Sequence, residues 1–149
     1  MKSIKVVFTR TSGIFPFFIR LVTKSYYNHV YIQYPNGYII EADKRDGVVI
    51  VPEGSTRGNV VDSGFFEFNI PDNRFSTATF FGMKRIRSKY DWKGILGCFL
   101  NKPHMFDSSK YYCSRLVRDW LWLANVIDEM PSKGNITPKQ LMKLLSSVS

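Results

Sequence analysis

The order of local patterns along the chain constrains its fold most, because every strand-like segment ends by residue 70 and all but one of the helix-like segments come after it. Runs rich in β-branched and aromatic residues, separated by turn signals, predict strands over 4–9, 29–34, 38–42, 47–51 and 64–70. Helical patterns predict helices over 15–24, 72–89, 91–100, 109–127 and 137–145. Strands followed by helices indicate an α+β domain with an antiparallel sheet.

The length of the chain fits one domain over residues 1–149 with one hydrophobic core. Its longest apolar runs fall short of the 18 or so residues of a transmembrane helix. Near the start, Arg10 ends an apolar stretch that is too short for a signal peptide. We therefore expect a first strand there and a cytoplasmic protein, in a host cytoplasm if the source is viral.

Basic residues outnumber acidic ones by 21 to 12, which gives a formal net charge of +9. This balance favours anionic partners. As a binding partner, we expect an anionic surface, either lipid or acidic protein, in preference to nucleic acid. The charges are scattered except for the basic run 84–89, which a solvated helix face explains equally well.

Two cysteines and two histidines are the only residues of these types, and their spacing does not match a zinc site. We expect no metal and no cofactor. We also expect Cys98 and Cys113 to be reduced, with Cys98 buried and unreactive in its apolar surroundings.

Cys113 follows a polar loop and precedes an amphipathic helical pattern, so it should lie in the first turn of a helix. There the helix dipole and the unpaired backbone N–H groups stabilise a thiolate, and the same groups can hold an oxyanion. The structural alternative is a small core residue, since free cysteines are usually buried.

A nucleophilic thiolate needs a base, for which histidine is the usual residue. His29 begins a predicted strand, whereas His104 lies in a predicted surface loop, so His29 is the better candidate. Its alternative role is that of a hydrogen-bonded structural histidine.

The orientation of such a histidine is commonly fixed by a third polar group, for which Glu41 is the candidate. If residues 35–37 form a three-residue loop, Glu41 shares a face with His29 as a diagonal neighbour. If Asn36-Gly37 forms a two-residue turn, which that dipeptide favours, Glu41 faces the other way. Asp43 and Gln33 are alternative orienting residues.

Three segments resemble two motifs of a known family. The segments 28–34 (NHVYIQY) and 36–42 (NGYIIEA) look like the histidine motif of the circularly permuted NlpC/P60-like proteins, and 111–117 (YYCSRLV) is similar to their cysteine motif. These proteins belong to the papain-like superfamily, together with the lecithin:retinol acyltransferase group. Histidine precedes cysteine in permuted members, as it does here, and the resemblance extends over nearly the whole chain except 43–65.

The resemblance implies a small antiparallel sheet or half-barrel packed against helices, with the nucleophile at a helix N-terminus. It implies Cys113 as nucleophile, His29 as base and Glu41 as third polar residue of a cysteine peptidase or amidase. Beside the Cys113 backbone N–H, the candidates for a second oxyanion or substrate contact are Tyr112, Thr9 and Arg10.

The expected reaction is hydrolysis of a peptide or isopeptide bond through an acyl-enzyme, with a cell-wall peptide or a protein conjugate as substrate. A cell-wall substrate would require delivery without an export signal, for example by a phage particle or by lysis. One alternative is an acyltransferase or hydrolase of lipids or thioesters, of the lecithin:retinol acyltransferase type. The other is a basic, non-enzymatic binding module on the same scaffold.

Overall fold

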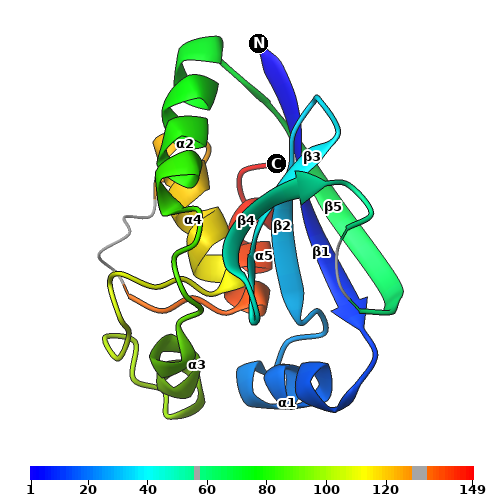
Figure 1. The fold of residues 1–149 in the computed structure, drawn as a ribbon, viewed down its shortest axis with the longest axis vertical. Coiled ribbons are helices and arrows are strands. Elements are labelled where there is room, and N and C mark those ends of the chain that lie inside the picture. The colour runs from blue at the N-terminus through cyan, green and yellow to red at the C-terminus, as the bar shows by residue number, and fades with distance from the viewer. Residues whose placement is uncertain (56–57, 129–133) are drawn as a thin grey trace.

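A five-stranded antiparallel sheet with the strand order β4-β3-β2-β1-β5 forms the centre of the computed structural model, which describes residues 1–55, 58–128 and 134–149 (Figure 1). The strands are β1 (Lys2–Thr11), β2 (His29–Gln33), β3 (Tyr38–Asp43), β4 (Gly47–Pro52) and β5 (Val60–Ile70). Within the described residues the helices are α1 (Ile14–Thr23), α2 (Asp72–Arg85), α3 (Trp92–Phe99), α4 (Cys113–Leu123) and α5 (Pro138–Ser146). The predicted α+β class with an antiparallel sheet is thereby confirmed.

Helix α4 forms the main packing contact of the sheet. It lies against β2 and β3, while α2 and α5 pack against α4 in turn. Its apolar side chains Leu116, Val117 and Trp120 are fully buried in one core with strand residues such as Val30 and Ile32. Burial of this apolar surface is the main stabilising contribution to the fold.

Helices α1 and α3 lie next to each other at the lower end of the molecule, away from α2 (Figure 1). Their contact includes the rings of Phe15 and Trp92, which meet edge to face with centroids 5.4 Å apart. None of the helices in the described ranges is long and apolar enough to cross a membrane.

Two helices are shorter in the structure than the sequence pattern predicts. The helix predicted over 72–89 ends at Arg85, because the next residues bond to the start of β4 instead: Arg87 N–H donates to Val48 O at 2.9 Å, and Val48 N–H donates to Ser88 O at 2.9 Å. This crossing requires Gly47, where an added Cβ would lie 1.9 Å from Ser88 O.

The helix predicted over 109–127 begins only at Cys113 and ends at Leu123. Before it, the Asp107 carboxylate accepts hydrogen bonds from the backbone N–H and the hydroxyl of Ser109, which hold a turn in place of a helical one. By contrast, the capping box predicted at Thr137 and Gln140 is present at the start of α5.

Asp91 connects the helices α3 and α4 through a buried carboxylate. Its Oδ1 accepts a hydrogen bond from Gly94 N–H at 2.9 Å and caps α3. Its Oδ2 pairs with the Arg115 guanidinium at 3.1 Å, and the two side chains are 0% and 6% exposed. Arg115 also donates to Asp107 O and Lys110 O, which anchors the loop before α4.

We predict that Asp91→Ala lowers the free energy of unfolding by about 3–5 kcal/mol, because it leaves the Arg115 charge buried without its partner. The matched control is Lys110→Ala, which removes the more exposed ion pair with Asp107 and should cost no more than about 1 kcal/mol. Urea denaturation followed by circular dichroism measures both. Equal losses in the two variants would show that the buried pair does not hold this region.

Candidate active site

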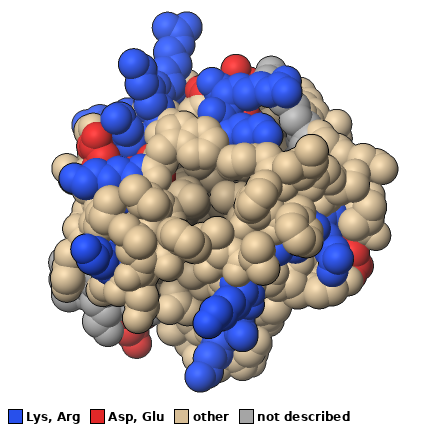
Figure 2. All heavy atoms as spheres, turned by 90° about the horizontal axis from the view of Figure 1, so that it is seen from below, with Lys and Arg blue, Asp and Glu red and all other residues tan. Residues whose placement is uncertain are grey.

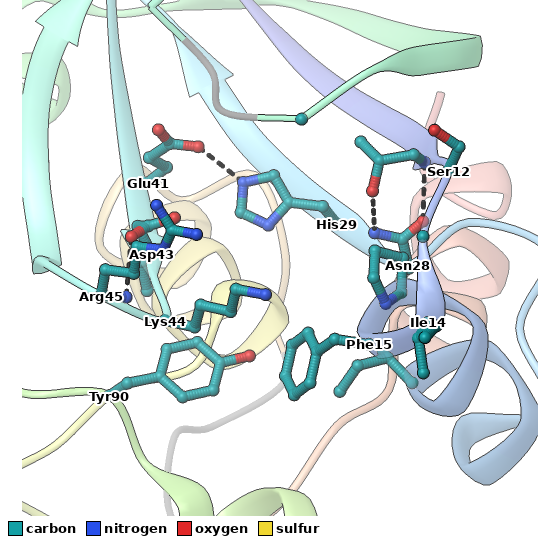
Figure 3. A pocket seen from close by; sticks show the side chains of 16 residues that line it. Ser12, Ile14, Phe15, Asn28, His29, Glu41, Asp43, Lys44, Arg45 and Tyr90 are labelled. Carbon is teal, nitrogen blue, oxygen red and sulfur yellow. Dashed lines mark hydrogen bonds and ion pairs between the residues drawn. The ribbon is translucent and has the colours of Figure 1, made fainter.

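His29 and Glu41 are joined by a short hydrogen bond between two neighbouring strands. His29 is the first residue of β2 and Glu41 lies in β3. The distance from His29 Nε2 to Glu41 Oε2 is 2.6 Å, with side-chain exposures of 16% and 5% (Figure 3). A carboxylate in this place fixes the plane of the ring and determines which nitrogen carries the proton.

The geometry of the hairpin brings the two side chains together. Ile32 pairs with Ile40 and Gln33 pairs with Ile39, and Tyr34 N–H donates to Tyr38 O at 2.8 Å. The loop is therefore the three-residue one, with Gly37 in the left-handed region at φ 79°. This is the register in which Glu41 and His29 were predicted to share a face, and the tighter turn does not form.

The two alternative orienting residues, Gln33 and Asp43, form hydrogen bonds with groups other than the imidazole. Gln33 Nε2 donates to Glu53 Oε2 at 2.7 Å. Asp43 Oδ1 accepts backbone N–H groups of Arg45 and Asp46 at 2.8 and 3.1 Å, in the turn that leads into β4. Glu41 is thus the carboxylate that contacts the imidazole.

Cys113 is the first residue of α4, as its sequence context predicted. The first hydrogen bond of the helix runs from Leu116 N–H to Tyr112 O at 3.1 Å. The N–H groups of Cys113, Ser114 and Arg115 consequently have no acceptor within the helix. These groups and the helix dipole favour a negative charge at this position.

The Cys113 thiol lies near enough to the imidazole of His29 to act on its pKa. Burial by itself lowers the pKa of His29, but the hydrogen bonds and negative charges of Cys113 and Glu41 outweigh it and raise this pKa to about 10. Because Glu41 engages Nε2, the nitrogen left for Cys113 is Nδ1. The arrangement favours the protonated form of the His29 imidazole.

Tyr112 and Ser114 hold the start of α4 through buried hydrogen bonds to the chain before α5. The Tyr112 hydroxyl accepts from Ile136 N–H at 2.7 Å and donates to Asn135 Oδ1 at 3.1 Å. The Ser114 hydroxyl donates to Ile136 O at 2.7 Å. The position of Cys113 is therefore set by contacts on both sides of it.

A pocket of about 470 Å³ opens onto the imidazole (Figure 3). One wall is formed by Ser12, Ile14 and Phe15 at the start of α1, and the opposite wall by β3 and the residues after it. His29 and Glu41 line the pocket, whereas Cys113 is 4% exposed and is not among the lining residues. The imidazole thus connects the pocket with the buried thiol.

Tyr90 is a pocket residue to which the sequence pattern assigned no role. Its backbone lies beside Tyr111, since Asp91 N–H donates to Tyr111 O at 3.0 Å and Tyr111 N–H donates to Lys89 O at 3.1 Å. Burial and the nearby negative charge of Cys113 raise the pKa of the Tyr90 hydroxyl well above its usual value. Tyr90 therefore brings a neutral hydroxyl to the pocket, and its place there follows from the pairing of these two segments.

Of the three candidates for a second oxyanion contact, Thr9 is the best placed. It lies opposite His29 in the β1–β2 pair, and its buried Oγ1 has no hydrogen-bond partner in the described part of the chain. The Tyr112 hydroxyl is committed to Asn135 and Ile136, and the Arg10 guanidinium stacks on Tyr26 at 4.6 Å. We therefore prefer Thr9 to Tyr112 and Arg10 as the second oxyanion contact.

The second cysteine differs from expectation, since Cys98 is partly exposed and not buried. Partial burial nevertheless raises the pKa of its thiol to about 11. His104 is exposed and lies outside the pocket. Across residues 1–55, 58–128 and 134–149, no three His, Cys, Asp or Glu side chains are grouped as a metal site would require.

We predict that Cys113→Ala lowers the pKa of His29, because it removes the thiol hydrogen bond and charge while burial of the ring remains. Glu41→Gln should lower it as well, because the remaining amide carries no charge. A pH titration of the imidazole signals by NMR measures these shifts, with His29→Gln identifying the resonance. Cys98→Ala is the control and should leave the pKa unchanged; an unchanged value in Cys113→Ala would refute the contact.

Neither a family model nor a curated protein matches the sequence. The function is therefore inferred from the geometry of His29, Glu41 and Cys113 and from the resemblance of the two motifs that contain them.

Proposed function

We propose that this protein is a cysteine hydrolase of the papain-like kind, which cleaves an amide bond through an acyl-enzyme. The observation that carries the proposal is the position of His29, which is hydrogen-bonded to Glu41 and lies near enough to the thiol at the start of α4 for that thiol to act on its pKa. A nucleophile, a base and an orienting carboxylate in this order form the arrangement by which thiols are activated. The order of the motifs and the antiparallel sheet agree with a permuted NlpC/P60-like domain.

In the proposed mechanism, His29 holds the proton of the Cys113 thiol, and the thiolate attacks the carbonyl carbon of the substrate. The tetrahedral oxyanion accepts a hydrogen bond from the Cys113 N–H, which the helix leaves unpaired, and from the Thr9 hydroxyl. The imidazolium then protonates the leaving amine. Water, deprotonated by the neutral imidazole, attacks the thioester and releases the acid and the thiol.

Glu41 acts on the imidazole and not on the substrate. Its hydrogen bond to Nε2 directs Nδ1 towards Cys113, and its charge stabilises the imidazolium. Glu41 itself transfers no proton during the reaction. Its loss should therefore slow the reaction less than the loss of the nucleophile or the base.

A second candidate is hydrolysis or transfer of a lipid ester or thioester acyl group. It is favoured by the apolar residues Ile14, Phe15 and Pro16 on one wall of the pocket. The acyl-enzyme would be the same, and a hydroxyl or amine acceptor would replace water in the transfer reaction. The non-enzymatic alternative, a basic binding module, would require that binding be independent of Cys113.

We predict that Cys113→Ala and His29→Ala each lower turnover by about 10⁴-fold or more, and that Glu41→Gln lowers it by a smaller factor. The measurement is release of fluorophore from a panel of peptide, isopeptide, thioester and lipid-ester substrates. Gln33→Ala is the matched control, because Gln33 is on the strand of His29 but bonds to Glu53. Full turnover by Cys113→Ala on the preferred substrate would rule out covalent catalysis at this residue.

We also predict that an acylating cysteine probe modifies Cys113 before Cys98. Cys98 is more accessible, but its thiol pKa of about 11 leaves it protonated at neutral pH. Mass spectrometry after brief treatment of the folded protein locates the adduct, and His29→Ala should slow it. Faster modification of Cys98 would contradict the activation of Cys113 by His29.

A further inference from the structure

Helix α1 carries an apolar stripe that faces solvent. Ile14, Phe17, Phe18 and Leu21 follow the i, i+3, i+4, i+7 spacing by which helices usually bury one face. Here these four side chains are between 53% and 79% exposed. The opposite side of α1 is held by Ile19, which is buried. The helix is thus amphipathic with its larger apolar face directed outward.

Helix α3 repeats the pattern beside it. Trp92, Leu96, Phe99 and the adjoining Leu100 are spaced for one face of a helix and are between 45% and 60% exposed. Because α1 and α3 are in contact, the two stripes form one surface, which we call the α1/α3 surface. Figure 2 views this end of the molecule and shows a broad uncharged area with a hollow in it.

Positive charges border the α1/α3 surface. Lys and Arg side chains stand around the uncharged area in Figure 2, and acidic ones are few. The segments 11–28 and 92–106 contain no Asp or Glu but carry the cations Arg20, Lys24, Lys93 and Lys102. Apolar side chains inside a cationic border are typical of a surface that binds anionic membranes.

A second hollow of about 310 Å³ adjoins this border. Its lining includes the side chains of Lys44, Arg45, Lys89 and Lys110, together with Trp92 of the α1/α3 surface. Asp46 also lines it, and Lys110 is paired with Asp107 at 3.2 Å. The net positive charge of the lining and the indole beside it match a phosphate headgroup at the level of the membrane interface.

We propose that the α1/α3 surface docks onto an anionic lipid bilayer. The apolar stripes would enter the boundary between headgroups and acyl chains, and the lysines and arginines around them would contact lipid phosphates and carboxylates. The charge border favours this occupant over a second copy of the chain, because two copies would bring their cations together. Binding to the bilayer does not depend on the catalytic proposal, and Cys113 takes no part in it.

Docking in this orientation would also place the catalytic pocket at the membrane. Ile14, Phe15 and Pro16 belong to α1 and line the pocket that contains His29. Lys44 extends over the Phe15 ring at 4.1 Å, so the same residues form the mouth of the pocket and the edge of the docking surface. A substrate embedded in or attached to the bilayer would then meet the pocket directly.

The test is flotation of the full chain with vesicles of phosphatidylcholine alone and with vesicles that also contain phosphatidylserine. We expect binding to the anionic vesicles that weakens as salt is raised. Phe18→Ser and Phe99→Ser should each weaken it by roughly tenfold. Lys89→Glu combined with Lys93→Glu should weaken binding to anionic vesicles more than to neutral ones.

Phe80→Ser is the matched control, because Phe80 is 58% exposed but lies on α2, far from this surface in the fold. It should bind as the parent does, and so should Cys113→Ala. Circular dichroism of each variant confirms that it is folded. Three results would overturn the proposal: no binding to anionic vesicles, equal loss of binding in Phe80→Ser, or a dimer in solution that Phe18→Ser dissociates.

Discussion

The buried pair of Asp91 and Arg115 is the interaction on which the geometry of the site depends most. One carboxylate caps α3 and neutralises a guanidinium in the first turn of α4. Two charges removed from water are stable only when their remaining hydrogen-bonding groups are also satisfied. Here the guanidinium donates hydrogen bonds to the backbone carbonyls of residues 107 and 110. The carboxylate accepts hydrogen bonds from the backbone N–H groups of residues 94 and 107.

This arrangement connects three parts of the molecule that are separate in sequence. The segment that supplies Tyr90 runs into the cap of α3, and the loop held by Arg115 runs into Cys113. The thiol, the pocket wall and the apolar helix α3 are therefore positioned by the same polar contacts. The imidazole of His29, which acts on the thiol, is on β2, a strand against which α4 packs.

Much of this arrangement could be predicted from the sequence because its signals are local. The position of Cys113 follows from a polar loop before an amphipathic helix, and Thr137 and Gln140 marked the start of α5. The meeting of His29 with Glu41 depended on the loop 35–37, for which the Asn-Gly dipeptide favoured the wrong turn. Both turns satisfy local backbone preferences, and pairing of the buried strands selects between them.

What could not be predicted depends on contacts between distant segments. The end of α2 at Arg85 is set by hydrogen bonds to β4, and the role of Tyr90 is set by its pairing with Tyr111. The sequence also did not show that the apolar stripes of α1 and α3 face solvent. Their spacing is that of a buried face, and only the complete core shows that these side chains are left outside it.

The loop at 35–37 has a consequence for how this chain can vary. Surface loops usually tolerate insertions and deletions, because few contacts depend on their length. A change of loop length that slid β3 by one position against β2 would exchange the faces of Ile40 and Glu41. A carboxylate would enter the core and an aliphatic side chain would meet the imidazole. Functional relatives should therefore keep the length of this loop, together with glycine or another residue that tolerates a positive φ at position 37.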